Sequence, residues 1–309
     1  MSNLTPAPAP RWRVIVDALP LTIVLCLVLY WAATALPPPS PQAPLKPVTA
    51  ASSQGLLALF AQHDYAWPPQ GPVPRLAVQA LPPDLAELPV STRKALFFSI
   101  LTPLILAENE RLQQERSQLQ KLLARSDWTE AERNELAALA KRYAVRGELS
   151  DPETQRQLLL RVDEIPLGLA LAQAAKESGW GTSRFAREAR NLFGVWTWDR
   201  SQGIVPAARP SGATHLVRVF PDLQASVRNY MHTLNTGAAY STLRLRRAYL
   251  RSIGAPLQPL ALADGLERYS ERGQIYVKEV RALILGNHLD QLDGVTLAPQ
   301  GTTSRGRQG

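Results

Sequence analysis

From residue 91 onward, hydrophobic residues recur at intervals of three and four, the spacing that places them on one face of a helix. Helices are therefore expected over residues 91–125, 129–145, 152–165, 166–179, 183–190, 223–234, 241–252, 256–266 and 274–285. Start signals support two of them, because Thr129 with Glu132 forms a capping-box pattern and Asp151 is followed directly by a proline. Pro103 should kink the first helix.

Residues 195–220 have a different pattern. Aromatic and β-branched residues stand there among Gly, Pro and Ser, which is typical of two or three short strands joined by turns. The expected fold is therefore α+β and mainly helical, with one small β excursion after the helix that ends at Gly179.

An uncharged run of 19 residues, from Ala18 to Leu36, lies near the N-terminus. A helix of this length can span the apolar core of a bilayer, which is roughly 30 Å thick. Arg11 and Arg13 precede the run and no Lys or Arg follows it until Lys46, which places the N-terminus in the cytoplasm. We expect an uncleaved single-pass anchor, with the rest of the chain outside the cytoplasm; a cleaved signal peptide is the alternative.

These patterns divide the chain into six parts. The expected parts are a cytoplasmic tail (1–13), a transmembrane anchor (14–36), a Pro-rich linker (37–83), a helical platform (84–150), the main α+β domain (151–290) and a disordered tail (291–309). The platform could also offer a coiled-coil face to a partner helix.

Composition narrows the chemistry. The formal net charge of +8 and the pI of about 9.9 favour an anionic partner, and nucleic acid, acidic lipid and bacterial cell wall all qualify. The single cysteine, Cys26, lies in the apolar N-terminal run, so no disulfide can form in the remaining chain. The four histidines are scattered and there is no P-loop or GxSxG motif, so neither a metal nor a cofactor is expected.

Glu177 is the strongest candidate for a chemical role. It lies near the C-terminal end of an apolar helix, beside Ala174, Ala175 and Trp180. Burial by these neighbours and the negative end of the helix dipole both disfavour the ionised carboxylate, which would raise its pKa. A carboxyl group that stays protonated near neutral pH can act as a general acid; a solvated glutamate at a helix end is the alternative.

Several separated motifs resemble those of bacterial N-acetylglucosaminidases. The segment Ala-Gln-Ala-Ala-Lys-Glu-Ser-Gly-Trp-Gly at 172–181, followed by Asn-Leu-Phe-Gly at 191–194, resembles the signature of the FlgJ-type flagellar enzymes and of the autolysins in glycoside hydrolase family 73. Segments that resemble the Bax-type subgroup more closely lie at 161–166, 182–188, 203–206, 226–231 and 269–273. The likeness covers about residues 88–289.

The resemblance implies a lysozyme-like fold, in which the helix carrying Glu177 lines a cleft and the β excursion forms its opposite wall. It implies an endo-β-N-acetylglucosaminidase that hydrolyses β-1,4 bonds in peptidoglycan, with Glu177 as general acid and residues 151–290 as the catalytic domain, held in the periplasm by an anchor in the inner membrane. Peptidoglycan then takes the place of nucleic acid as the anionic partner. The alternatives are a lytic transglycosylase that uses the same Glu177, and a catalytically silent wall-binding protein.

The second catalytic group is harder to assign. Two-carboxylate glycosidases hold the second carboxylate roughly 5–9.5 Å from the acid. Asp199 is the only acidic residue between positions 188 and 222, and Leu216 stands where the resemblance leads us to expect glutamate. Either Asp199 acts as base or charge stabiliser, or the 2-acetamido oxygen of the substrate attacks the anomeric carbon and Glu177 needs no carboxylate partner.

The resemblance also implies the remaining site residues. Tyr269 and Tyr276 would orient the acetamido group, with core packing as the alternative for each. The expected sugar-binding residues are Trp180, Asn191, Phe193, Trp196 and Trp198. The tryptophans offer flat faces on which sugar rings stack, or they fill the core; the other two belong to the turn at the cleft floor.

Overall fold

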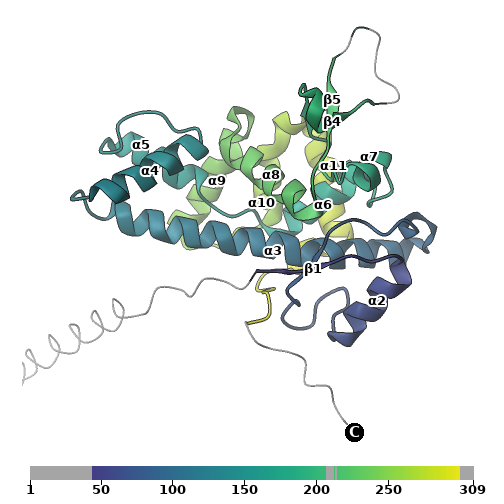
Figure 1. Ribbon diagram of the computed structural model, residues 1–309. Helices are drawn as coiled ribbons and strands as arrows, with labels where there is room; N and C mark the ends of the chain where they lie inside the picture. The colour runs from purple at the N-terminus through teal and green to yellow at the C-terminus, as the bar shows by residue number, and fades with distance from the viewer. Residues whose placement is uncertain (1–43, 207–211, 213, 300–309) are drawn as a thin grey trace, which may run out of the picture. The chain divides into compact units, whose positions relative to one another are not determined.

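The long helix α3 (Val90–Leu123) is the central element of the computed structural model, which describes residues 44–206, 212 and 214–299. Figure 1 shows most of the other helices above α3, with β1 and α2 below it. By length and composition α3 could cross a membrane, but 61% of its most apolar window is buried inside the domain. It is therefore the core helix of this fold. The anchor expected over residues 14–36 lies outside the described residues.

Pro103 lies inside α3, and the helix continues on both sides of it. A proline has no N–H, so the carbonyl group four residues earlier, that of Ser99, has no helical donor. The Tyr65 hydroxyl donates to this carbonyl over 3.0 Å. A side chain from an earlier segment thus satisfies the backbone group that the proline leaves open.

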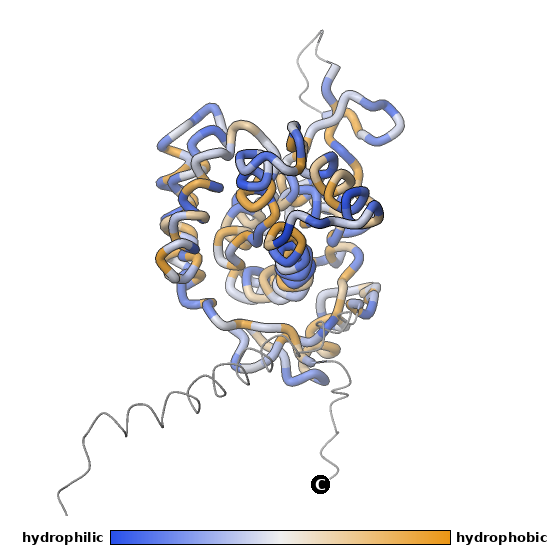
Figure 2. The backbone as a smooth tube through the Cα atoms, turned by 90° about the vertical axis from the view of Figure 1, so that its left-hand side faces the viewer, coloured by the Kyte–Doolittle hydropathy of each residue, from blue (hydrophilic) through white to orange (hydrophobic). Residues whose placement is uncertain are grey.

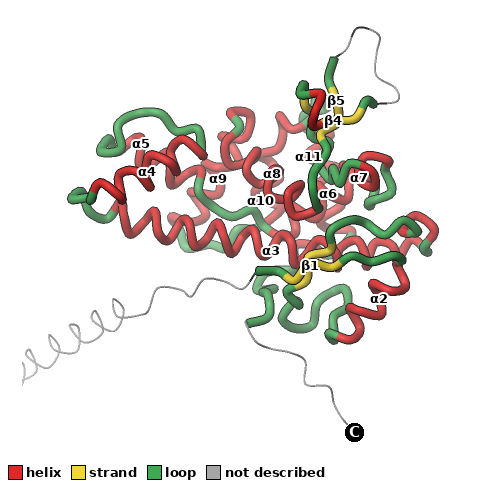
Figure 3. Tube along the Cα trace, viewed as in Figure 1, coloured by secondary structure: helices red, strands yellow, loops and turns green. Residues whose placement is uncertain are grey.

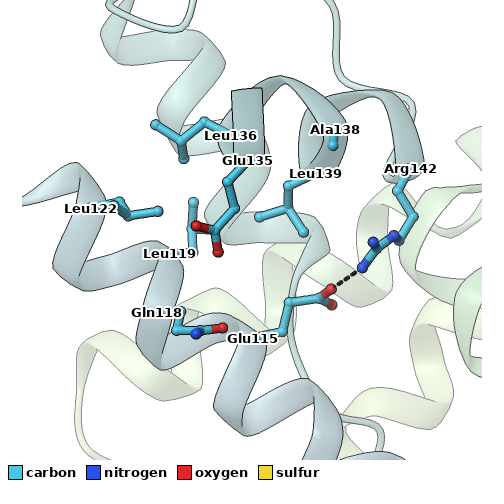
Figure 4. A pocket seen from close by; sticks show the side chains of 9 residues that line it. All are labelled: Glu115, Gln118, Leu119, Leu122, Glu135, Leu136, Ala138, Leu139 and Arg142. Atoms are coloured by element: carbon cyan, nitrogen blue, oxygen red, sulfur yellow. Dashed lines mark hydrogen bonds and ion pairs between the residues drawn. The ribbon is translucent and has the colours of Figure 1, made fainter. Parts of the chain in front are cut away.

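The helical platform forms as expected. α4 (Glu130–Arg142) begins at Thr129 with a complete capping box, and α5 (Pro152–Arg161) begins at Asp151 with proline at its first position. Between α3 and α4 lies a pocket of about 200 Å³, lined by leucines and edged by the ion pair of Glu115 with Arg142, as Figure 4 shows. These leucines pair the two helices within one chain.

Ten of the 12 residues of α6 (Leu167–Ser178) are buried. The remaining helices are α7 (Arg184–Glu188), α8 (Leu223–Thr236), α9 (Ser241–Ser252), α10 (Pro259–Ala263) and α11 (Gln274–Gly286), together with the short 3-10 turns Leu85–Glu87, Arg200–Gln202, Ala238–Tyr240, Asp264–Tyr269 and Leu289–Gln291. α6 contacts α3, α10 and α11. Figure 2 shows hydrophobic and hydrophilic stretches alternating along these helices, as amphipathic elements require.

α3 fixes the start of α6 directly. The Asn109 side chain donates to the Ile165 carbonyl over 2.7 Å and accepts from the Ile165 N–H over 3.0 Å. Two residues earlier, Asp163 is buried and forms ion pairs with Arg247 and Arg251 of α9. The helix that carries Glu177 is therefore attached to two neighbours before its first turn.

The β excursion is a three-stranded antiparallel sheet in the order β3-β5-β4. Its strands are β3 (Trp196–Thr197), β4 (Gly203–Ile204) and β5 (Leu216–Arg218). In Figure 3 these strands extend from the helical body at the top of the molecule. The described part of the chain is thus mainly helical with small sheets, as expected.

The linker expected over residues 37–83 is a wrong prediction from Lys46 onward. β1 (Lys46–Val48) pairs in parallel with β2 (Leu76–Val78), and α2 (Ser53–Gln62) buries Leu56 and Phe60 completely or nearly so. The short apolar patch Leu56–Phe60 predicts a local helix within this segment, and α2 confirms it. What the composition does not show is that the segment packs against the rest of the domain.

The tail expected to be disordered over residues 291–309 is also wrong up to residue 299. Val73 forms a parallel bridge with Leu297, and the Arg75 side chain donates to the Ala298 carbonyl over 2.8 Å. The same guanidinium forms two hydrogen bonds of 3.0 Å with Glu110 of α3. Both ends of the described chain therefore meet beneath the central helix.

Candidate active site

Glu177 lies in the last turn of α6, followed by an unusual backbone. Gly179, Trp180 and Gly181 have φ values of 57°, 60° and 78°, three left-handed residues in succession. At Gly181 a Cβ atom would lie 3.0 Å from Leu81, Leu85 and Phe97, so glycine is required there by space as well as by φ. This sharp turn ends the helix directly after the candidate acid.

Trp180 adopts its left-handed conformation because its side chain is held by packing. Its ring meets Phe98 edge-on at 5.2 Å between centroids and Phe97 at 6.3 Å, and the Lys94 ammonium lies 4.4 Å from its centroid. A bulky residue at positive φ is strained, and such strain persists only where the surroundings hold it. Trp180 therefore packs against α3, and its expected role in sugar binding stays a prediction.

The Glu177 carboxyl group is partly buried, and burial raises its pKa. The Tyr276 hydroxyl, through a hydrogen bond, and the Lys176 ammonium lower that pKa, while the charge of Glu279 raises it further. The Oε1 atom is buried and forms no hydrogen bond with any described residue. A raised pKa together with an unpaired buried oxygen is typical of a functional carboxyl group.

Four tyrosines from four elements interact electrostatically with this carboxyl group. Burial and the charge of Glu177 raise the pKa of each of them, which places their hydroxyls in the electrostatic range of the carboxylate. They are Tyr230 of α8, Tyr240 of the turn Ala238–Tyr240, Tyr269 at the end of the turn Asp264–Tyr269, and Tyr276 of α11. The sequence pointed to Tyr269 and Tyr276; Tyr230 was only part of a quoted motif, and no signal indicated Tyr240.

These rings are packed against one another. Tyr269 stacks on Tyr276 with 5.2 Å between centroids, and Tyr230 stacks on Phe193 with 3.9 Å. The Tyr269 hydroxyl donates to the Phe193 carbonyl over 3.2 Å. Phe193 is therefore a packing residue that supports the tyrosines, and its own side chain is 4% exposed.

Gln173 joins two of these tyrosines. The Tyr230 hydroxyl donates to Gln173 Oε1 over 2.6 Å, and Gln173 Nε2 donates to the Tyr276 hydroxyl oxygen over 2.9 Å. All three side chains are buried, with exposures of 2% or less. Sequence reasoning quoted Gln173 within the motif and gave it no role.

A second charged group lies beside Glu177. Lys176 Nζ is 2.5 Å from Glu279 Oε2, and Arg272 also pairs with Glu279. The Lys176 ammonium lies 5.4 Å from the centroid of the Tyr276 ring. Glu279 is thus a nearby carboxylate, but it is neutralised by two cations.

Asp199 lies on the exposed turn before β4. Its carboxylate accepts hydrogen bonds from the backbone and hydroxyl of Ser201 and from the Gln202 side chain, and the Ser201 hydroxyl is the main cause of its lowered pKa. Lys176 and Glu279 are the described groups whose charges act on the pKa of Glu177, and Asp199 is not among them. Its role as a second catalytic carboxylate stays a prediction.

The other expected sugar-binding residues differ in exposure. Trp196 and Trp198 are 57% and 69% exposed, and Trp196 stacks on His215 at 4.4 Å. Asn191 is 2% exposed and joins the turn to β5, because its amide donates to the Val195 and Arg218 carbonyls. The two exposed tryptophans are accessible for stacking by a sugar ring, whereas Asn191 holds the neighbouring backbone in place.

Metal chemistry has no evident place in the described residues. No group of three or more His, Cys, Asp or Glu side chains among them could hold a metal ion.

Comparison with known proteins gives the family of the chain. Residues 154–288 match the family model Glucosaminidase, described as mannosyl-glycoprotein endo-beta-N-acetylglucosaminidase. The chain is 34% identical over 207 residues to protein bax of Escherichia coli (strain K12), covering 66% of this chain and 74% of that protein. Among solved structures, it is similar to the catalytic domain of the autolysin Auto from Listeria monocytogenes, with 16% identity, 58% of this chain and 97% of that chain covered, and a TM-score of 0.33.

Proposed function

Because the chain belongs to the Bax-type glucosaminidase family and is a glycoside hydrolase of the endo-β-N-acetylglucosaminidase type, we propose that it cleaves peptidoglycan strands on the reducing side of N-acetylglucosamine with Glu177 as general acid. The observation that carries this proposal is the Glu177 carboxyl group itself. It ends a buried helix, burial raises its pKa, and four tyrosines interact with it electrostatically.

The proposed reaction begins with Glu177 in its protonated form. The carboxyl group gives its proton to the glycosidic oxygen as the bond to the anomeric carbon breaks. The departing strand leaves with a new hydroxyl group, and positive charge develops on the sugar that remains. Glu177 is then a carboxylate, able to take a proton from the water that completes hydrolysis.

The acetamido route accounts best for the charges around Glu177. In this route the 2-acetamido oxygen of the substrate bonds to the anomeric carbon, and water later opens the ring so formed. Glu279 is paired with two cations and Asp199 is held in its own turn. Tyr240 and Tyr269, by contrast, are only partly buried and lie where the charge of Glu177 acts on them, so their hydroxyls are suited to orient the acetamido group. A lysozyme-like cleft, with Trp196 and Trp198 on its far wall, is part of this proposal.

Product analysis tests the reaction. Purified peptidoglycan is digested with the full-length chain in detergent, and the fragments are examined by mass spectrometry before and after borohydride reduction. The proposal predicts N-acetylglucosamine at new reducing ends, with one water added per cleavage. Fragments that lack this water and resist reduction would instead identify a lytic transglycosylase using the same acid.

The location of the enzyme is also part of the proposal. The uncharged run from Ala18 to Leu36, with Arg11 and Arg13 before it, supports a single-pass anchor in the inner membrane with the catalytic domain in the periplasm. Protease added to spheroplasts should then remove the domain, and should leave it intact in cells with a closed outer membrane. Protection of the domain in spheroplasts would contradict this orientation.

A further inference from the structure

The fully buried side chain of Gln173 lies between two tyrosines of the site, one turn before Glu177 on the same face of α6. We propose that Gln173 is a positioning residue, which directs the hydroxyl hydrogen of Tyr276 toward the Glu177 carboxyl group, while Tyr230 fixes the orientation of the Gln173 amide. This inference rests on the proposed function, since it assigns a task to residues that serve Glu177.

The direction of the hydrogen bonds carries the argument. A side-chain amide donates only through its nitrogen and accepts only through its oxygen. Gln173 Nε2 donates to the Tyr276 oxygen over 2.9 Å. The single hydrogen of that hydroxyl is therefore not used on Gln173 and is available to Glu177, whose pKa the Tyr276 hydroxyl lowers.

Tyr230 selects this orientation of the amide. Its hydroxyl donates to Gln173 Oε1 over 2.6 Å. With the amide reversed, Tyr276 would donate to Gln173, and the hydrogen of the buried Tyr230 hydroxyl would have no acceptor among the described residues. Glu177 would lose its donor at the same time. A buried polar group without a partner is unfavourable, so the orientation with both tyrosines satisfied is preferred.

The surroundings prevent solvent from replacing this arrangement. Gln173 is 0% exposed, and Tyr230 and Tyr276 are each 2% exposed. The Tyr276 ring also contacts the Tyr269 ring, 5.2 Å away between centroids, and the Lys176 ammonium, 5.4 Å from its centroid. The amide is therefore the group that sets where the Tyr276 hydrogen points.

The test is a double-mutant cycle between Gln173 and Tyr276, with kcat/KM measured against pH on peptidoglycan. Gln173→Met keeps the length of the side chain and removes both its donor and its acceptor. Tyr276→Phe removes the hydroxyl group. The full-length chain in detergent is used, and the melting temperature is recorded for each variant.

Each single variant should lower kcat about tenfold, as a misplaced catalytic group does, with less than about a twofold change in KM. The high-pH limb of the kcat/KM profile should move toward higher pH. The reason is that Glu177 loses a hydrogen-bond donor that stabilises its charged form, which raises its pKa further. The double variant should behave like Tyr276→Phe alone. The proposal would be overturned if the effects of the two single variants added in the double variant. It would also be overturned if the high-pH limb of the kcat/KM profile did not move in Gln173→Met.

Gln155→Met serves as the matched control. Gln155 is a partly buried glutamine of α5 whose amide donates to the Leu149 carbonyl over 2.9 Å. This variant should leave the pH profile unchanged even if it lowers the melting temperature. Glu177→Gln separates the two claims. If it keeps full activity, the proposed function fails and the inference falls with it, whereas an inactive Glu177→Gln beside an unmoved profile in Gln173→Met removes the inference alone.

Discussion

The pKa of the Glu177 carboxyl group depends both on its burial and on the polar and charged groups around it. The sequence predicted a raised pKa, and the structure confirms the direction, with burial as the main cause. The Tyr276 hydroxyl and the Lys176 ammonium lower the pKa and so oppose the effect of burial. A raised pKa is the direction that the proposed general acid requires.

Replacing Glu177 by glutamine should therefore stabilise the protein in a pH-dependent way. Because the folded-state pKa is raised, the folded protein binds more protons than the unfolded chain from about pH 4.5, the ordinary value, up to the raised one. Wild-type stability falls as pH rises through that window, whereas glutamine has no such dependence. The test is to measure the melting temperatures of wild type and Glu177→Gln at pH 4 and at pH 8. The two should be similar at pH 4, and Glu177→Gln should melt at the higher temperature at pH 8. An equal difference at both values would contradict the burial argument.

Only part of this residue set could be predicted from the sequence. Glu177, Tyr269 and Tyr276 lie in motifs whose resemblance gave them roles, but Tyr230 and Tyr240 come from two further elements. The tyrosines come together near Glu177 because of how α8 and α11 pack relative to α6. The periodicity of hydrophobic residues in the sequence does not specify this packing. For Trp180 the structure confirms core packing, one of the two alternatives that the sequence left open, but neither its partner Phe98 nor its positive φ could be predicted.

At the scale of elements, prediction worked where the signal was local. The capping box at Thr129 and the proline start at Asp151 both appear at their expected helix ends. Pro103 is the instructive exception, because its effect depends on a residue 38 positions earlier. The Tyr65 hydroxyl satisfies the Ser99 carbonyl, so helical structure persists on both sides of the proline.

Tyr65→Phe should destabilise the protein by about 1–3 kcal/mol, since it leaves the buried Ser99 carbonyl without a donor. In a Pro103→Ala background the backbone N–H returns and can bond to the same carbonyl, so the loss should shrink to about 1 kcal/mol or less. Urea denaturation of the four proteins measures both values. Equal losses in the two backgrounds would show that the Tyr65 hydroxyl does not act through the Ser99 carbonyl.

At the scale of the whole molecule, the segment after the expected anchor belongs to the fold. Pairing of β1 with β2 and the bridge between Val73 and Leu297 join parts of the chain that are far apart in sequence. Local composition describes only neighbouring residues, so the Pro-rich segment was predicted to be a linker and the Gly-, Thr-, Ser- and Gln-rich end a disordered tail. The contacts that contradict these predictions lie across α3.

Two truncations test whether the residues before position 84 form a linker or a folded segment. Removal of residues 1–43 should leave a cooperatively unfolding protein, because the described elements begin at Lys46. Removal of residues 1–83 also deletes Leu56, Phe60 and Leu76, each worth about 1.5–3 kcal/mol of burial. Thermal unfolding should then lose its cooperative transition or shift down by more than 10 °C, on the order expected for such losses. Equal stability of the two truncated proteins would support the linker that was predicted over residues 37–83.

The most direct test of the central claim compares wild type with Glu177→Gln on purified peptidoglycan, counting new reducing ends over time. The substitution keeps the shape of the side chain and removes the proton that is transferred. We expect the rate to fall at least about 100-fold at the pH optimum of the wild type, where Glu177 carries its proton, with the melting temperature unchanged or raised. A variant that releases reducing ends at the wild-type rate would show that Glu177 is not the acid.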